Sequence, residues 1–231
     1  MRPEHDRPST ARPTEDRAAR AVPAAFADDF VRDLDRLFAW RRDVRAFRPD
    51  PPPEALLTES LAAMRLAPSV GLSEPWRLLR IESDGARAAC LANFEAANQA
   101  ALAGYRGEQA QLYATLKLSG MREAPIQLAV FCDDATAKGS KLGARSMPET
   151  RAYSVVGAIT LFWLALRARG LGLGWVSILD PERVSRDLAV PQGWTFVAYL
   201  CVGWAQEASE SPELERQGWE RRADRLEIET R

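Results

Sequence analysis

Histidine is almost absent from this chain. Of its 231 residues only His5 is a histidine, and it lies in an N-terminal stretch rich in proline and charge. Serine and cysteine hydrolases rely on an imidazole base, and most catalytic zinc sites rely on imidazole ligands. The sequence therefore excludes these chemistries. Because no other spacing of metal ligands replaces the missing histidines, we expect no metal site.

Cysteine is also scarce. Cys90, Cys132 and Cys201 lie far apart, form no Cys-x-x-Cys pair and stand among apolar residues. This pattern is typical of buried thiols in a reducing compartment and excludes a disulfide framework. We expect all three thiols to be structural.

Nothing in the sequence indicates a membrane or a nucleic acid as a partner. The longest apolar run, Val155–Leu166, is well short of the roughly 20 residues that span a bilayer. The N-terminus lacks the hydrophobic stretch of a secretory signal. Lys and Arg total 31 against 32 Asp and Glu, for a formal net charge of −1, so no overall cationic field attracts DNA or anionic lipid. We expect a cytoplasmic protein.

Most of the chain has the composition of a folded domain. Hydrophobic residues make up 46% and charged residues 27%, which is usual for globular proteins. Residues 1–24 differ, because prolines alternate there with charges of both signs and almost nothing is apolar. We expect residues 1–24 to form a flexible tail and residues 25–231 to form one domain.

The spacing of apolar residues predicts five main helices and four strands. The helices are expected from about Phe26, from Glu54 to before Pro68, over Ser83–Asn93, over Pro148–Arg169 and from Ser211; the strands over Trp76–Glu82, Ile126–Cys132, Gly172–Ile178 and Thr195–Gly203. The last two strands are almost continuously hydrophobic, as in a sheet covered on both faces. The helix over 148–169 is apolar nearly all round, so we expect it to be buried, in part against another subunit. This order favours an α+β fold with a mostly antiparallel central sheet flanked by helices.

Two segments have the residue types of an anion site. Arg41, Arg42 and Arg45 place three guanidinium groups within five residues, and such groups suit bidentate binding of phosphate. Alternatively, they are the solvated end of a helix, where cations favour the dipole. The turn Ala67–Trp76 carries hydroxyl groups directly before a strand and offers backbone donors, although an ordinary structural turn has the same composition. In contrast, the glycines of Gly170–Gly174 follow a helix and enter a strand, which is the reverse of a dinucleotide-binding turn.

Seven segments together resemble a known family. They are Arg41–Phe47, Ala67–Arg77, Glu123–Asp133, Met147–Thr150, Tyr153–Val156, Gly174–Pro181 and Tyr199–Trp204. In order and spacing they resemble the BluB family of 5,6-dimethylbenzimidazole synthases, which belongs to the nitroreductase-like flavoproteins. The resemblance covers roughly residues 30–222. It implies a nitroreductase-like fold and a homodimer with an exchanged terminal segment and active sites at the interface.

The resemblance also implies an unusual reaction. Reduced FMN is a substrate that is consumed: dioxygen reacts with the reduced isoalloxazine, the ring system is fragmented, and 5,6-dimethylbenzimidazole and erythrose 4-phosphate are released. The family needs no metal, and a separate flavin reductase supplies the reduced FMN. Residues 95–118 correspond to the family's lid. Such a cover would exclude water and leave no room for a nicotinamide above the flavin.

The family's site residues can be placed on this sequence. The positions that match its FMN-binding residues are Arg41, Arg42, Val44, Arg45, Ser69, Gly71, Leu179 and Arg222. Asp43 matches the essential carboxylate, which could relay protons; the alternative is an ion pair with a neighbouring arginine, and both can hold together. Ser177 matches the active-site serine, whose hydroxyl could bond flavin or oxygen species; the alternative is a satisfied polar group in an apolar strand. Glu74 departs from the family, since a neutral amide is expected there.

Two other functions remain open. One is an NAD(P)H-dependent nitroreductase or flavin reductase that passes hydride through bound FMN on the same fold. Asp43 speaks against it, because reductases of this fold usually carry a small neutral polar residue at that position. The other is a non-enzymatic module that stores reduced FMN and delivers it to a partner.

Overall fold

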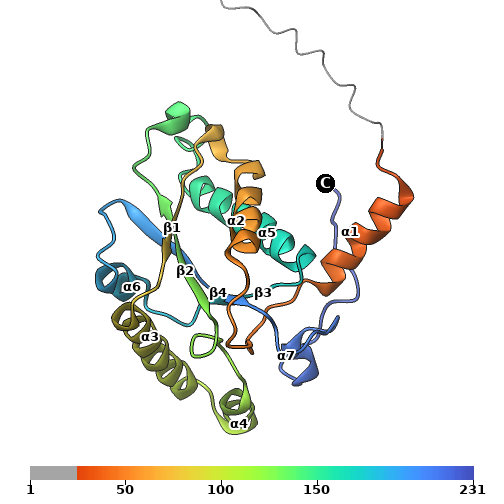
Figure 1. Ribbon diagram of the computed structural model, residues 1–231, viewed down its shortest axis with the longest axis vertical. Helices are drawn as coiled ribbons and strands as arrows, with labels where there is room; N and C mark the ends of the chain where they lie inside the picture. Colours follow the sequence, from red (N-terminus) through yellow and green to blue (C-terminus); the bar gives the residue numbers. More distant parts are fainter. Residues whose placement is uncertain (1–24) are drawn as a thin grey trace, which may run out of the picture.

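The computed structural model describes residues 25–231 as an α+β fold, which confirms the predicted class (Figure 1). The helices are α1 (Asp28–Trp40), α2 (Glu54–Ala62), α3 (Asp84–Ala103), α4 (Gly107–Thr115), α5 (Thr150–Ala168), α6 (Pro181–Asp187) and α7 (Glu213–Arg216). The strands are β1 (Trp76–Arg80), β2 (Ile126–Asp133), β3 (Gly172–Val176) and β4 (Trp194–Gly203). The tail predicted for residues 1–24 lies outside the described residues.

The four strands form one antiparallel sheet in the order β1-β2-β4-β3. The strand predicted over Gly172–Ile178 ends two residues early, since its last pair joins Val176 to Tyr199. Beyond it the chain turns to Asp180, whose carboxylate accepts the backbone N–H groups of Glu182 and Arg183 and begins α6. This helix was not among the predicted elements. Its signals were present, because Asp is a favoured N-cap and Pro181 suits the first helical position.

Both faces of the sheet are covered, as the continuous hydrophobicity of the strands predicted. On one face α2 and α5 pack on alternate residues of β2 and β4, among them Leu128 and Leu200. On the other face α3 and α6 cover Phe131 and Tyr199. The three cysteines are free and buried in these two clusters, which confirms their structural role.

Helix α5 is buried within this chain on one side only. Its inner face is buried, and Gly170 ends it with a left-handed φ of +80°. Its outer face is open within this chain, since Tyr153 is 61% and Val156 40% exposed. The face that we expected to meet another subunit is therefore apolar and is left uncovered by the rest of this chain.

The region 95–118 is divided between two elements. Helix α3 begins at the predicted cap, where Ser83 Oγ accepts the N–H of Ala86, but it continues ten residues beyond Asn93 to Ala103. A turn at Gly104–Arg106 separates it from α4, which lies at the lower end of the molecule in Figure 1. Among the described residues no helix is both long and apolar enough to cross a membrane.

Candidate active site

The segment Arg41–Phe47 runs along the edge strand of the sheet. Helix α1 ends at Trp40, and the extended chain that follows bridges Asp43 to Leu173 of β3, then Phe47 to Ala205 beyond β4. The N–H of Val44 donates to the Leu173 carbonyl at 3.0 Å. This approach requires the glycines of β3, because a Cβ at position 174 would overlap the Val44 carbonyl oxygen and one at position 172 would lie 2.8 Å from Val44 Cγ2. The glycine repeat, which has the reverse order of a dinucleotide-binding turn, thus allows the arginine segment to lie directly against the sheet.

The Asp43 carboxylate is held on both oxygens. Oδ1 accepts the backbone N–H of Trp175 at 2.8 Å, and Oδ2 accepts Nε–H of Arg45 at 3.0 Å. The Asp43 side chain keeps 32% of its surface exposed, whereas Arg45 keeps 13%. The predicted ion pair is therefore present, and it leaves part of the carboxylate open to a ligand.

Arg45 links this carboxylate to the segment that follows α4. Its Nη1 donates to the carbonyl of Lys117 at 3.2 Å, two residues after α4 ends. The turn that carries Lys117 continues to Gly120, whose Cα packs so closely on the Phe47 ring that a side chain would overlap it. Arg45 thus orients Asp43 and fixes the segment after α4 to the arginine segment.

Arg41 and Arg222 form the cationic part of the site. The Arg41 guanidinium lies 4.6 Å from the centre of the Trp163 ring on α5, an arrangement in which the ring stabilises the cation. Burial lowers the pKa of Arg41; the nearby Asp43 carboxylate opposes this shift, and the positive charge of Arg222 adds to it. Arg222 comes from the C-terminal segment, so the two ends of the domain supply the cations.

Arg42 lies beside this pair and binds the C-terminal segment. Its Nε and Nη2 both donate to the carbonyl of Glu210, the first at 2.7 Å, and its Nη1 donates to the Arg41 carbonyl at 2.6 Å. Burial, and then the charges of Arg222 and Arg41, lower its pKa. The guanidinium of Arg42 therefore fastens residues 205–217 to the arginine segment.

Two cavities adjoin the segment and share Arg42, Asp43 and Arg45. One, of about 140 Å³, is also lined by Arg41, Arg222 and Leu214. The other, of about 250 Å³, is lined by Val44, Trp163 and residues of the C-terminal segment, among others. Ligand sites usually occupy roughly 300–1,000 Å³, so neither cavity alone reaches the usual size.

Ser177 and Leu179 follow the end of β3. Ser177 is exposed, lies two residues beyond Trp175, and its hydroxyl bonds no other described residue. Leu179 is half-buried and packs against the core cluster of α3 and α6. Neither residue lines the two cavities.

Ser69 and Gly71 lie elsewhere in the chain. Ser69 Oγ accepts the N–H of Glu74, and the backbone of Gly71, at φ +57°, packs on the carbonyls of Gly139 and Leu142. This turn precedes β1, at the end of the sheet opposite the bridge of Phe47 to Ala205. Figure 1 shows the same separation. Within one chain, the fold does not bring Ser69 and Gly71 to Arg41 and Asp43.

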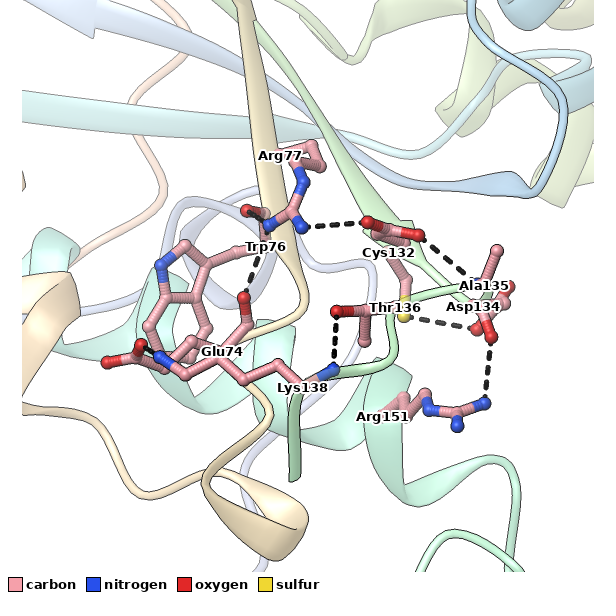
Figure 2. Close-up of polar contacts among 10 residues, drawn as sticks. Glu74, Trp76, Arg77, Cys132, Asp134, Ala135, Thr136, Lys138 and Arg151 are labelled. Atoms are coloured by element: carbon pink, nitrogen blue, oxygen red, sulfur yellow. Dashed lines mark hydrogen bonds and ion pairs between the residues drawn. The ribbon is translucent and has the colours of Figure 1, made fainter. Parts of the chain in front are cut away.

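A polar network surrounds the turn (Figure 2). Glu74 forms an ion pair with Lys138, and Arg77 pairs with Asp133 at 2.7 Å. Arg151 of α5 donates to the Asp134 carbonyl at 2.9 Å. Lys138 offsets the charge of Glu74, so this departure from the expected amide leaves little net negative charge at the turn.

Sequence reasoning missed three partners of the site: Trp163, Trp175 and Lys117. The sequence indicated Trp163 only as an aromatic residue in an apolar helix, which does not point to a functional site. The other two contribute backbone groups, for which a side-chain pattern gives no signal. Within residues 25–231 no cluster of three or more His, Cys, Asp or Glu side chains could hold a metal ion.

Comparison with known proteins identifies the family of this chain. Residues 38–204 match the model of the nitroreductase family. A 5,6-dimethylbenzimidazole synthase of Rhodospirillum rubrum is 55% identical over 197 residues, 85% of this chain and 93% of that protein. A protein of the same description from Rhodobacter capsulatus is 51% identical over 187 residues, 81% of this chain and 90% of that protein.

A solved structure shows the same fold. The crystal structure of an oxidised iodotyrosine deiodinase with FMN and 3-iodo-L-tyrosine superposes with a TM-score of 0.66 at 23% identity, covering 86% of this chain and 97% of that chain. At this identity the likeness concerns the fold alone. Together, the family model and the relatives above 50% identity show that the chain belongs to the nitroreductase family and, within it, to the family of the 5,6-dimethylbenzimidazole synthases.

Proposed function

We propose that this protein is a 5,6-dimethylbenzimidazole synthase, which uses dioxygen to fragment reduced FMN into 5,6-dimethylbenzimidazole, the lower ligand of cobalamin, and erythrose 4-phosphate. The observation that carries the proposal is the half-open Asp43 carboxylate, fixed by Trp175 and Arg45 among guanidinium groups. Two relatives named as 5,6-dimethylbenzimidazole synthases are identical to this chain at half or more of the aligned residues.

The residues of the site fit a flavin phosphate. Arg41 and Arg222 line one cavity, and the charge of Arg222 adds to the lowering of the Arg41 pKa by burial. This mutual repulsion of cations is relieved by a bound dianion, and guanidinium groups match phosphate oxygens bidentately. Arg41 and Arg222 would therefore hold the phosphate. Arg45 and the Val44 backbone would face the flavin beside it.

When bound, reduced FMN supplies the electrons that dioxygen accepts, and its ring supplies the atoms of the product. Asp43 would hold or move protons at its exposed oxygen surface, since a carboxylate bonded to one N–H and one guanidinium stays in place while it exchanges a proton. The Ser177 hydroxyl, free among the described residues, would donate to the ligand. Helix α4 and the end of α3 would act as the lid that excludes water.

A second copy of the chain would complete the site. Ser69 and Gly71 are too far along the sheet to reach the ligand of Arg41 in the same chain, and the outer face of α5 is apolar and open. Homodimers bury such faces and can build sites from both subunits. The described C-terminal segment packs on its own chain as far as Arg222, so the predicted exchange would involve only residues beyond it.

The test starts with FMN reduced without air. The protein is added, oxygen is admitted, and the products are identified by mass spectrometry. We expect 5,6-dimethylbenzimidazole and loss of the yellow flavin colour. A matched sample with NADPH and FMN-loaded protein should oxidise NADPH very slowly, and a separate flavin reductase should restore product formation. Rapid NADPH oxidation with intact FMN would indicate the reductase, and intact FMN without turnover would indicate the storage module.

A further inference from the structure

An aromatic cluster joins the lid to the C-terminal segment. The ring centres of Tyr105 and Tyr113 are 4.8 Å apart, and Trp219 meets them edge to face at 5.5 Å and 6.0 Å. Tyr105 lies in the turn before α4, and Tyr113 lies on α4. Edge-to-face pairs of this kind add specific attraction to the burial of the rings.

This cluster is the main attachment of α4. Tyr113 is the one buried residue of that helix, and its hydroxyl donates to Asn98 Oδ1 on α3 at 2.7 Å. The remaining residues of α4 are exposed or half-buried. A helix of nine residues with a single buried side chain opens easily, because little apolar surface has to be exposed. Helix α4 is therefore held mainly through Tyr113, whose ring Trp219 contacts edge to face.

The turn after α7 determines where Trp219 lies. Gly218 takes a φ of +75°, the N–H of Gly218 donates to Glu215, and the N–H of Trp219 donates to Leu214 at 2.8 Å. These bonds form a Schellman turn, in which glycine ends the helix and the next residue is directed to a fixed side. Three residues later, Arg222 and Leu214 line the cavity of about 140 Å³ described above.

We infer that Trp219 is a positioning residue that makes closure of the lid depend on the phosphate of FMN, so that phosphorylated flavin is selected over riboflavin. The inference rests on the proposed function, because it takes FMN as the ligand. A phosphate bound by Arg222 fixes the segment Gly218–Arg222, and the fixed Trp219 ring holds Tyr105 and Tyr113 down. Riboflavin has no phosphate, so it leaves Arg222 and this segment unfixed and α4 open.

Amide hydrogen exchange tests the inference on the full chain with oxidised flavins, which need no turnover. FMN and riboflavin are each added at saturation, judged by quenching of flavin fluorescence. We expect FMN to slow exchange over Gly107–Thr115 by about tenfold or more and riboflavin to leave it nearly unchanged. Equal protection by the two flavins would overturn the inference.

Two variant pairs distinguish the proposed coupling between the phosphate and α4 from general damage to the fold. Trp219→Ala should lose the FMN-dependent protection of α4 while FMN still binds, and Trp219→Phe, which keeps an aromatic ring, should restore much of it. Arg222→Gln should also lose the protection, whereas Arg225→Gln, an exposed arginine of the same segment, should keep it. Full protection in Trp219→Ala or in Arg222→Gln contradicts the inference.

The outcome is separable from that of the proposed function. If wild-type protein fragments reduced FMN but protects α4 equally with both flavins, the inference fails and the function stands. If FMN protects α4 through Trp219 and no product forms, the proposed function is wrong and the inference about Trp219 stands. With both correct, Trp219→Ala should also release more hydrogen peroxide per FMN consumed, because an open lid admits water.

Discussion

The carboxylate of Asp43 accepts a hydrogen bond of 2.8 Å from the backbone N–H of Trp175, a residue 132 positions later in the chain. Its other oxygen is bonded to Arg45, which is itself bonded to the Lys117 carbonyl. These two side chains together connect the arginine segment, the edge strand and the segment that follows α4. This arrangement fixes the orientation of the carboxylate before any ligand arrives.

Replacing Asp43 by Asn should stop product formation and preserve flavin binding. The amide can still accept the Trp175 N–H, but it cannot take up a proton at neutral pH, and loss of a general acid or base costs about 100-fold or more in rate. Removing a negative charge beside Arg41 should tighten the binding of an anionic ligand. Stopped assays of 5,6-dimethylbenzimidazole and flavin fluorescence titrations measure the two effects. Full product yield from the variant removes Asp43 from the mechanism.

Replacing Ser177 by Gly should give a smaller loss. The hydroxyl is exposed and bonds no described residue, so the fold should lose at most about 0.5 kcal/mol, as for other surface changes. A single hydrogen bond to the ligand is worth about 1 kcal/mol, so the rate should fall roughly fivefold. Urea unfolding and the oxygen-dependent assay are run on the same preparation. An unchanged rate would leave Ser177 a structural residue.

Replacing Gly174 by Ala should displace the arginine segment. The new Cβ would overlap the Val44 carbonyl oxygen, and overpacking of this kind costs about 1–3 kcal/mol or more. Flavin affinity and product formation should both fall, because Asp43 and Arg45 flank Val44. Gly85→Ala is the matched control, since nothing lies within 4 Å of its Cβ. If Gly174→Ala keeps wild-type stability by urea unfolding, the close packing described above is wrong.

A charge on the outer face of α5 should separate the proposed dimer. Val156 is 40% exposed in the single chain, and burying an unpaired carboxylate at an interface is costly. Val156→Asp should therefore be monomeric by light scattering and should bind FMN at least about tenfold more weakly. Ala88→Asp, on α3 across the sheet, should stay dimeric. A dimeric, fully binding Val156→Asp would move the interface elsewhere.

Stability should fall as the pH rises above about 9. Burial raises the pKa of Cys132 and of Cys201 to about 12 from the ordinary value of 9.0, so the unfolded chain releases these protons first. Between these two pH values each thiol removes about 1.4 kcal/mol of stability per pH unit. Below pH 9 the contribution is fully present. Urea unfolding at pH 8 and pH 11 measures the change, and Cys132→Ala, which cannot ionise, should show a smaller fall than wild type.

Local patterns were sufficient for most of the fold. Ser83 begins α3 where a capping residue was expected, Glu54 begins α2, and Gly170 ends α5. The strands agree with their hydrophobic runs to within about two residues because burial on both faces leaves a continuous signal. The motifs of the family are also local, so Asp43, Ser177 and the arginines could be named in advance, and their proposed roles stay predictions.

What the sequence by itself determined was the set of elements, the class of the fold and the residues that the family requires. Only the tertiary structure decided their partners: Arg42 faces the Glu210 carbonyl, Arg45 faces Lys117, and Gly174 of the unexplained glycine repeat admits Val44. It also decided that, within one chain, Ser69 and Asp43 lie toward opposite ends of the sheet. The physical reason is that periodicity and capping act over a few residues. A hydrogen bond to a carbonyl far away in the sequence depends instead on how the whole chain folds.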